Sequence, residues 1–399
     1  MKQIYPNSIT GKGVVHGGSV LEHKFGTSDP FTLGVEEEYM LLDGETFDLV
    51  QHIDTVLQAI SGHELEPRIN AELMQSVLEI ATPVCRNAAD VQRELLKLRA
   101  YVTSIAREKG LRVGSAGTHP FSLFERQRIT ARDRYRNLVD QLQYIARREL
   151  IFGMHVHVAV DDPEKAVQVV NGLLPQLGPL LALSASSPFW RGEPTGLSSS
   201  RQMVFAAFPR SGPPPRFRDY ADYAEVVGQL ERTGCIADYT HIWWDIRLHP
   251  RLGTIEIRIC DAITRVEDAV ALAAYCQALV KRLSEQFDRG EQIPTYHRIL
   301  TTENKWLSAR YGLEAPVMDL ATGARNRMPV AQLIRRTLKE IEPHARELGS
   351  ERELEGIGEI LARGNGSDRQ LRVFNANRDI VEVVEEIAKA TEAVPAALA

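Results

Sequence analysis

Three segments far apart in this sequence alternate in the same way between apolar and strongly polar residues. They are "GVEEEYM" at 34–40, "GMHVHVAV" at 153–160 and "TIEIRICDA" at 254–262. Successive side chains of a strand point to opposite faces of a sheet, so each segment predicts a strand with one apolar and one polar face. We expect helices to pack on the apolar face of the resulting sheet and a polar site to occupy the other face.

The polar positions carry glutamate, histidine and arginine instead of the threonine, serine and lysine usual on solvated strands. By alternation, the residues sharing the polar face are Glu36, Glu38, His155, His157, Glu256, Arg258 and Cys260. Sites dominated by carboxylates suit Mg²⁺ or Mn²⁺ better than Zn²⁺. Arg258, two residues from Glu256, is placed to neutralise a phosphoryl group.

Glu37 has a different role from its two neighbours. Alternation puts it on the apolar face together with Val35 and Tyr39. A buried carboxylate without a partner costs several kcal/mol, roughly, so Glu37 needs a basic partner or water there. We expect it to affect stability and to have no catalytic role.

A fourth stretch, "NAELMQSVLEIATP" at 70–83, fits either a strand or the start of a helix. It offers Glu72 and Glu79 to complete a multi-metal cluster, although their spacing alone does not show that they join it.

Between the strands the chain is mostly helical. Helical patterns follow Asn87, cover 137–150, begin at Pro163, run from a Thr264–Glu267 capping box to about Phe287, and dominate after residue 299. Long helical connections favour an α+β fold, with a largely antiparallel sheet and helices gathered on one face.

Composition narrows the class of protein. The chain has 399 residues, enough for one large domain or two, and a net charge of -6, so a general nucleic-acid binder is not expected. No run approaches about 18 apolar residues, which argues against a membrane span. The four cysteines form no CxxC pair and predict a reducing, cytoplasmic setting. Residues 1–29 lack periodicity and predict a mobile lead-in.

Common catalytic signatures are absent from the sequence. It contains no GxxxxGK[ST], no GxGxxG after a strand, no GxSxG and no HExxH. The HxH pair of His155 and His157 also occurs in zinc hydrolases, where it usually ends an early strand. Here it lies near the middle of the chain among glutamates, which favours the carboxylate site.

Several other residues leave alternatives open. Arg201 and Arg210 lie in a loop-rich stretch, 184–217. Two roles are open for them: binding of phosphate or a substrate carboxylate, or simple exposure to solvent. His119 lines the site or caps a turn. Trp243 and Trp244 are expected in the core or at the rim of the site more than as a surface that stacks on adenine. Cys260 is expected to be a buried side chain that only fills space. Asp261 is expected to end its strand.

The motifs also carry a family likeness. "FTLGVEEEYMLLD", "LEIATPV", "GTHPF", "GMHVHVAV", "TIEIRICDAITRVEDAVALAAYCQALV" and "ENKWLSARYGL" occur in this order. Over residues 31–375 the chain resembles the carboxylate-amine ligase family of type-2 glutamate–cysteine ligases. The resemblance implies a glutamine synthetase-like fold, a curved antiparallel sheet forming a funnel with helices on its outer face. It implies one catalytic domain over 30–375, a C-terminal helix and tail over 376–399, and a homodimer.

Site residues also follow from the resemblance. It implies metal ligands at Glu36, Glu38, Glu72, Glu79, His155 and Glu256, and a catalytic Glu-x-Arg pair at Glu256 and Arg258. His157 contacts nucleotide or substrate or ligates metal, since the family often lacks histidine there. With Arg201 and Arg210 it completes the candidate cofactor-binding set.

The activity that the resemblance implies uses ATP with Mg²⁺ or Mn²⁺. A carboxylate such as that of L-glutamate attacks the γ-phosphate of ATP, and an amine such as L-cysteine displaces phosphate from the acyl phosphate. The partners are then small molecules, with neither nucleic acid nor membrane. A phosphotransferase of the guanidino-kinase type and a catalytically dead nucleotide-binding protein are the alternatives.

Overall fold

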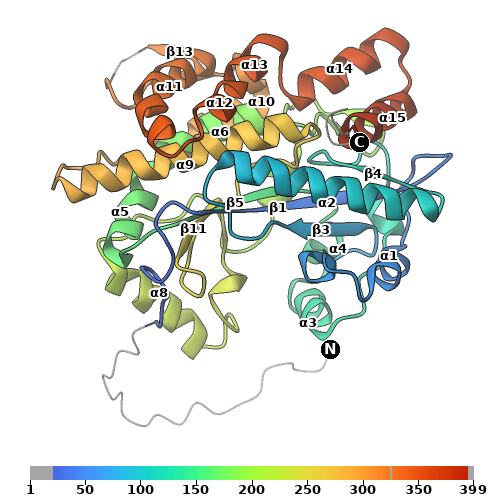
Figure 1. Cartoon of the computed structure of the whole chain (residues 1–399), viewed down its shortest axis with the longest axis horizontal. Helices are drawn as coiled ribbons and strands as arrows, with labels where there is room; N and C mark the ends of the chain where they lie inside the picture. Colours follow the sequence, from blue (N-terminus) through green and yellow to red (C-terminus); the bar gives the residue numbers. More distant parts are fainter. Residues whose placement is uncertain (1–20, 324–325, 394–399) are drawn as a thin grey trace, which may run out of the picture.

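A seven-stranded antiparallel sheet forms the centre of the protein (Figure 1). The computed structural model describes residues 21–323 and 326–393. The strands are β1 (Leu33–Asp43), β2 (Ile69–Ala71), β3 (Val77–Ala81), β4 (Leu111–Gly114), β5 (Met154–Ala159), β10 (Ile246–His249) and β11 (Thr254–Ile257). Their order is β10-β11-β5-β1-β3-β2, and β4 also pairs with β1. The ambiguous segment 70–83 therefore contributes two strands.

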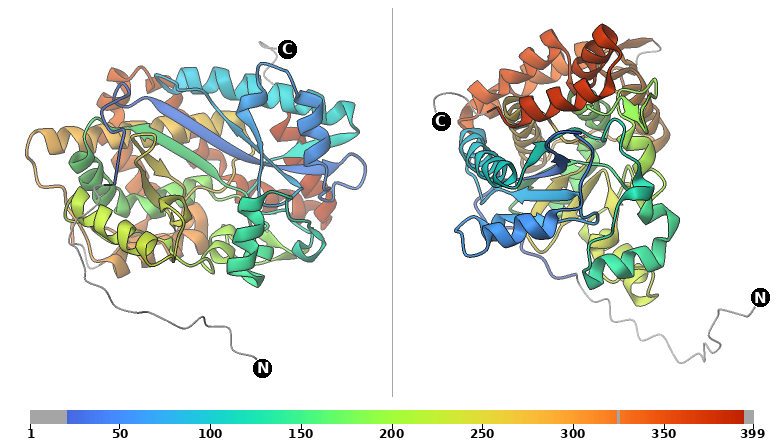
Figure 2. Two further views of the ribbon diagram at one scale, coloured as in Figure 1. Left: turned by 90° about the horizontal axis from the view of Figure 1, so that it is seen from below. Right: turned by 90° about the vertical axis from the view of Figure 1, so that its right-hand side faces the viewer.

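Helices cover the apolar face of this sheet, as the alternation predicts. The long helices α2 (Ala88–Glu108) and α9 (Val266–Asp288) lie along it, and α5 (Pro163–Leu173) packs on α9 (Figures 1 and 2). The side chain of Asn87 caps α2 by accepting from the backbone N–H of Asp90. The apolar positions of β1, β5 and β11 all belong to one buried core.

The apolar face of β1 also holds Glu37, which is completely buried. Arg99 of α2 pairs with it, with Nη2 2.5 Å from Oε1 and Nε 3.0 Å from Oε2. The hydroxyl of Tyr39 donates to the same carboxylate. Arg99 also donates to the carbonyls of Ile263 and Thr264, at 3.0 and 2.7 Å. The expected basic partner of Glu37 is thus confirmed.

The C-terminal helices pack over the same body. They are α10 (Arg298–Tyr311), α11 (Val330–Glu347), α12 (Glu351–Leu354), α13 (Gly356–Arg363), α14 (Gly366–Asn377) and α15 (Ile380–Thr391). A boundary at residue 375 falls inside α14, and α15 packs on β4 with Val383 and Ile387 in the second buried cluster. The packed body therefore continues to Thr391.

The described part of the expected lead-in is packed as well. Lys24 donates its backbone N–H to Pro250 O at 2.8 Å, Gly26 donates to Val160 O at 3.2 Å, and Phe25 is buried. Residues 21–29 thus pair with the ends of β5 and the β10–β11 hairpin. The rest of that prediction, residues 1–20, lies outside the described residues.

Shorter elements complete the fold. They are α1 (Ile53–Ile60), α3 (Asp133–Leu142), α4 (Tyr144–Arg147), α6 (Leu177–Ser184), α7 (Arg201–Phe205), α8 (Tyr220–Arg232), β6 (Phe189–Trp190), β7 (Glu193–Pro194), β8 (Ser211–Gly212), β9 (Trp243–Trp244), β12 (Pro316–Met318) and β13 (Arg327–Pro329). The stretch 184–217 is thus structured by short elements. The predicted Thr264–Glu267 capping box is wrong: Arg265 precedes α9 without a side-chain cap, because Thr264 donates its hydroxyl to Ser115 O.

One helical stretch, Pro163–Ser184, has the length and apolar composition of a membrane span. In this protein 78% of its most apolar window is buried within the fold, against α9 and the C-terminal helices. It packs as a core segment.

Candidate active site

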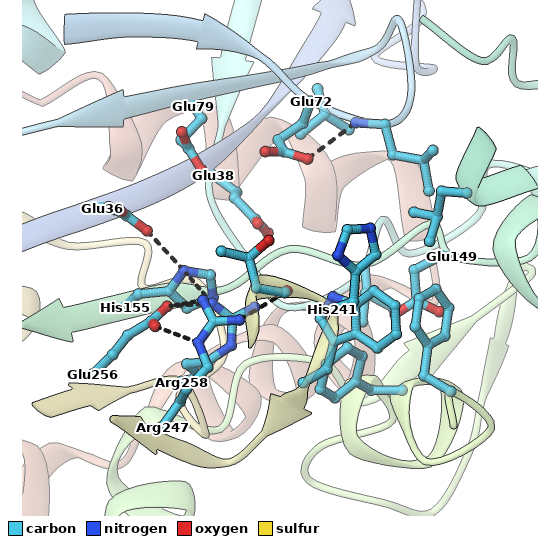
Figure 3. A pocket seen from close by; sticks show the side chains of 18 of the residues that line it. Glu36, Glu38, Glu72, Glu79, Glu149, His155, His241, Arg247, Glu256 and Arg258 are labelled. Carbon is cyan, nitrogen blue, oxygen red and sulfur yellow. Dashed lines mark hydrogen bonds and ion pairs between the residues drawn. The ribbon is translucent and has the colours of Figure 1, made fainter. Parts of the chain in front are cut away.

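The pairing register of the sheet brings the polar residues together. Directly opposite residues of antiparallel strands project to the same face. The opposite pairs are Glu36–His155, Glu38–Glu79, His157–Glu256 and Arg247–Glu256. Five neighbouring strands, β10, β11, β5, β1 and β3, therefore place their charged side chains on one surface (Figure 3).

This surface is the wall of a cavity of about 330 Å³. The sequence-predicted residues that line it are Glu36, Glu38, Glu72, Glu79, His155, His157, Arg201, Glu256 and Arg258. Arg210 is missing from the lining. Its Nε donates to His241 O at 3.0 Å and its guanidinium lies 5.3 Å from the Trp243 ring centroid. Arg210 thus supports two lining residues from behind.

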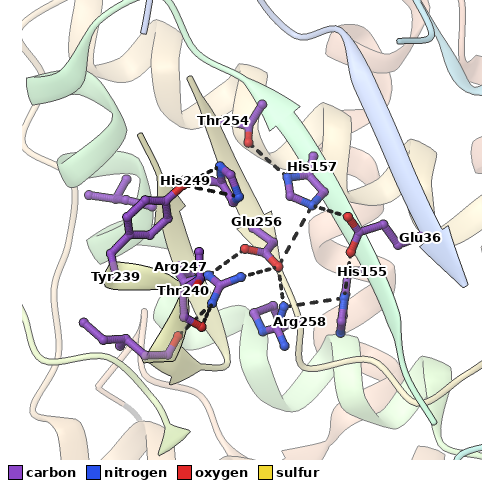
Figure 4. A network of polar contacts seen from close by, with 12 residues as sticks. Glu36, His155, His157, Tyr239, Thr240, Arg247, His249, Thr254, Glu256 and Arg258 are labelled. Atoms are coloured by element: carbon purple, nitrogen blue, oxygen red, sulfur yellow. Dashed lines mark hydrogen bonds and ion pairs between the residues drawn. The ribbon is translucent and has the colours of Figure 1, made fainter. Parts of the chain in front are cut away.

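Glu36 lies between the two histidines of β5 (Figure 4). Its Oε2 is 3.0 Å from His155 Nδ1, and its Oε1 is 3.4 Å from His157 Nε2. Burial opposes the charge of Glu36, but His157 and His155 hold its pKa well below the usual range. Burial and the charge of Arg258 lower the pKa of His155 to about 4, so this imidazole is neutral near pH 7.

Glu256 is held by two arginines (Figure 4). Arg247 forms a bidentate pair with it, at 2.7 Å from Nε and 3.0 Å from Nη2, and Arg258 donates to Oε1. Although burial raises the pKa of Glu256, Arg247 and Arg258 bring it well below the usual range. Arg247 is not among the site residues predicted from the sequence. A signal for it exists, because Arg247 and His249 alternate with apolar Ile246 and Leu248 in the same pattern as the other strands.

The other carboxylates of the cavity have no such partners. Among the described residues, no lysine, arginine or histidine forms an ion pair with Glu38, Glu72 or Glu79; Glu38 and Glu72 accept only backbone N–H groups, of Gly153 and Leu73. Burial and the charge of Glu72 raise the pKa of Glu38 to about 7. Burial and the neighbouring carboxylates raise the pKa of Glu79 well above its usual value. This corner of the cavity therefore gathers carboxyl groups that have no basic partner among the described residues.

The donor atoms fit a hard divalent cation. Oxygen-rich sets of this kind are preferred by Mg²⁺ and Mn²⁺. Glu38, Glu72 and Glu79 line the cavity as a first set of carboxylates. Glu36, His157 and Glu256 are a second set, whose ligand atoms all lie within 4.8 Å of one another. In the second set, His157 Nε2 is buried without a hydrogen-bond partner, while Thr254 Oγ1 lies 3.0 Å from Nδ1 and orients the ring.

Arg201 enters the cavity from α7. Its Nη1 donates to Ile259 O at 3.3 Å and lies 3.9 Å from Asp261 Oδ1. Asp261 does more than end a strand, because it also accepts hydrogen bonds from Ser186, Ser187 and Ser199. A Cβ on Gly153 would lie 2.5 Å from Arg201 Nη2, so the absence of a side chain there lets the guanidinium pass.

The remaining open alternatives are resolved by burial and contacts. His119 lies outside the cavity lining and holds a turn, since its Nδ1 accepts from Ser122 N at 2.9 Å. Trp243 lines the cavity, whereas Trp244 is buried against Phe217. Cys260 is completely buried filler.

Comparison with known proteins shows what this chain is similar to. The model of glutamate-cysteine ligase family 2 matches residues 32–389. A Rubrobacter xylanophilus protein named "Putative glutamate–cysteine ligase 2-1" is 43% identical over 93% of this chain and 97% of its own length. A Sorangium cellulosum protein named "Putative glutamate–cysteine ligase 2" is 42% identical over 90% and 95%.

Solved structures share the fold at low sequence identity. A glutamate–cysteine ligase from Francisella tularensis superposes with a TM-score of 0.65 at 13% identity, covering 93% of this chain and 91% of that one. A bifunctional glutathione synthetase from Pasteurella multocida gives 0.62 at 14% identity, covering 91% of this chain and 51% of that one. The sequence matches show the family, whereas the solved structures show only the fold. This chain belongs to glutamate-cysteine ligase family 2 and is a ligase that forms carbon–nitrogen bonds.

Proposed function

We propose that this ligase is ATP-dependent and joins the carboxylate of L-glutamate, or of a related amino acid, to an amine such as L-cysteine. The substrate carboxylate takes the γ-phosphoryl group of ATP, and the amine then attacks the acyl carbon and releases phosphate. The observation that carries the proposal is one cavity wall bearing unpaired carboxylates next to a partly buried arginine, Arg258. The similar Francisella tularensis structure is a complex with AMP, which agrees with a nucleotide in this cavity.

Two groups of residues would hold the metal ions that such a reaction needs. Glu38, Glu72 and Glu79 form the first group, and Glu36, His157 and Glu256 form the second. Bound Mg²⁺ supplies positive charge that neutralises the phosphates of ATP. With its proton on Nδ1, His155 donates to the ionised carboxylate of Glu36 and so fixes it.

Arg258 is the residue best placed to act on the phosphoryl group. Its Nη1 is bound to Glu256, and its Nε is buried without a hydrogen-bond partner. A preorganised donor of this kind stabilises charge that develops on the transferred oxygens without reorganising. Catalysis then rests on positioning and charge neutralisation.

Cys260, the cysteine next to the site, is not suited to act as the nucleophile. Cys85, Cys235, Cys260 and Cys276 are all free, and burial raises the pKa of Cys260, which lies next to the site, to about 12. A thiol in that state is inert. Free cysteines also agree with the cytoplasmic location that we propose for the enzyme.

An ADP-release assay tests the proposed function. L-Glutamate is incubated with ATP, Mg²⁺ and a panel of amines, and the product is identified by mass spectrometry. We expect ADP release that needs both the carboxylate and the amine, with an amide as product. A stable phosphorylated product formed without amide would identify a phosphotransferase, and ADP release that ignores both substrates would contradict the proposal.

The three carboxyl groups without a basic partner, Glu38, Glu72 and Glu79, predict that the effect of Mg²⁺ on protein stability depends on pH. A carboxyl group whose pKa is raised by folding makes folding less favourable as pH rises through that pKa. Glu38, with a pKa of about 7, Glu72 and Glu79 all shift in this direction. We expect the melting temperature without metal to fall between about pH 5 and about pH 7.5, the range between the ordinary pKa of a glutamate and the raised pKa of Glu38, and Mg²⁺ to restore it at the higher pH.

Differential scanning fluorimetry at both pH values, with Mg²⁺ or with EDTA, measures this effect. Glu79→Gln removes one of the three carboxylates and should show a smaller fall with pH and a smaller response to Mg²⁺. A melting temperature that is equally insensitive to Mg²⁺ at both pH values would argue against a cation among these residues.

A further inference from the structure

One carboxylate of the cavity belongs to neither candidate metal group. Glu149 follows α4 and lines the cavity on the far side from Glu36 and Glu256 (Figure 3). Both of its carboxylate oxygens are buried and have no hydrogen-bond partner. Within residues 21–323 and 326–393, no lysine, arginine or histidine nitrogen forms an ion pair with it.

A carboxylate in this state is incomplete as a structural group. Leaving a buried charged group without a partner is strongly unfavourable, so a purely structural glutamate would be expected to find one. Burial raises the pKa of Glu149 to about 8, even though Arg201 and Arg148 oppose the shift. A bound cation with hydrogen-bond donors would supply the missing hydrogen bonds and stabilise the ionised carboxylate.

The nearby arginines do not supply that partner. Arg148 turns away from the cavity, where its Nη2 donates to Val204 O at 3.2 Å and its guanidinium lies 5.9 Å from the Tyr144 ring centroid. Arg201 is committed to the backbone through Nη1 and Nη2, and its Nε is buried without a partner. An acceptor oxygen on Glu149 and a donor nitrogen on Arg201 thus both remain open.

The surroundings of Glu149 favour an organic cation over a second metal ion. Leu138, Ile151 and Phe205 line the same cavity, and Arg201 lies 5.7 Å from the ring centroid of Phe205. Mg²⁺ retains several waters and prefers clustered oxygen ligands. A cavity that offers apolar side chains as well as one unpaired carboxylate suits the ammonium group of a molecule with a small carbon body.

We infer that Glu149 binds the ammonium group of the acceptor amine, accepts one of its protons, and positions the resulting neutral nitrogen for attack on the activated carboxylate. This assignment rests on the proposed function and adds the amine subsite to it. Glu149 is then a substrate-binding residue on the opposite side of the cavity from Arg258. The unpaired Nε of Arg201 is available to a carboxylate of an amino-acid acceptor.

Glu149→Gln tests the inference, because glutamine keeps the shape and removes the charge. Hydroxylamine is an uncharged nucleophile at neutral pH and traps acyl phosphates as hydroxamates without needing an ammonium site. We expect hydroxamate formation from L-glutamate and ATP to stay within about two-fold of wild type. We expect KM for the cationic amine that wild type uses, among L-cysteine, glycine and ethylamine, to rise by about 10-fold or more.

Glu125→Gln is the matched control, since Glu125 is exposed, pairs with Arg191 and lies outside the cavity lining. Hydroxamate in both proteins with an unchanged amine KM would overturn the assignment of Glu149 alone. A raised Mg²⁺ requirement in place of a raised amine KM would also overturn it, by making Glu149 a metal ligand. Absence of hydroxamate in wild type would overturn the proposed function, and this assignment with it.

Discussion

Replacing Arg258 by alanine is expected to lower kcat by about two orders of magnitude or more, the loss typical of removing one preorganised donor. Arg258 combines three features: it is held by Glu256, its Nη1 lies 3.5 Å from His155 Nδ1, and its Nε has no protein partner. Glu256 remains paired with Arg247 after the change, so the site should keep its shape.

Turnover measured as ADP release under saturating substrates checks this expectation, with the melting temperature recorded alongside. Arg251→Ala is a suitable control, because Arg251 lies in the turn of the same β10–β11 hairpin, is 63% exposed and pairs with Asp238. Full turnover in the folded Arg258→Ala protein would remove Arg258 from the mechanism.

Replacing Glu37 by glutamine is expected to lower the free energy of unfolding by about 3–5 kcal/mol, the cost of breaking a buried ion pair. The change leaves Arg99 buried, at 3% exposure, without its counter-charge. Since Glu37 lies on the helix-covered face, turnover per folded molecule should stay close to that of wild type. Urea denaturation combined with ADP release separates the two effects.

Neighbouring glutamates of β1 provide the matched comparison. Glu36→Gln and Glu38→Gln should abolish Mg²⁺-dependent turnover while the protein stays folded, because both side chains line the cavity. The double change Glu37→Gln with Arg99→Met should recover part of the lost stability, since it removes both buried charges. A stable but inactive Glu37→Gln protein would contradict these separate roles of adjacent residues.

Alternation made much of this site predictable from sequence. A strand has a period of two, so the shared face of Glu36 and Glu38 and the opposite orientation of Glu37 follow from local geometry alone. The existence of a helix-covered face could be predicted in the same way, because the alternate positions of these strands are apolar and a solvent-exposed face would not be. The sheet and its helices, which those positions dictate, are the α+β fold that the structure has.

The parts of the site that could not be predicted from the sequence depend on contacts between distant segments of the chain. The pairing of Arg247 with Glu256 needs the β10–β11 register, and the carboxylate of Glu149 follows a short helix with no alternation to mark it. Arg210 was a cofactor-binding candidate by composition of its loop, but the Trp243 ring and His241 carbonyl hold it outside the cavity. Thr264, expected to cap α9, instead donates its hydroxyl to the carbonyl of Ser115, 149 residues away in sequence.

The strand order also dictates when the site is completed during synthesis on the ribosome. The strands β1 to β4 lie within the first 114 residues, whereas β5 begins at Met154 and β11 at Thr254. Residues Leu33–Glu37 of β1 thus have an open edge until β5 emerges, and open edges invite pairing with other chains. The nascent chain must also keep the carboxylates of β1 and β3 solvated until about 258 residues have been made, when Arg258 first becomes available.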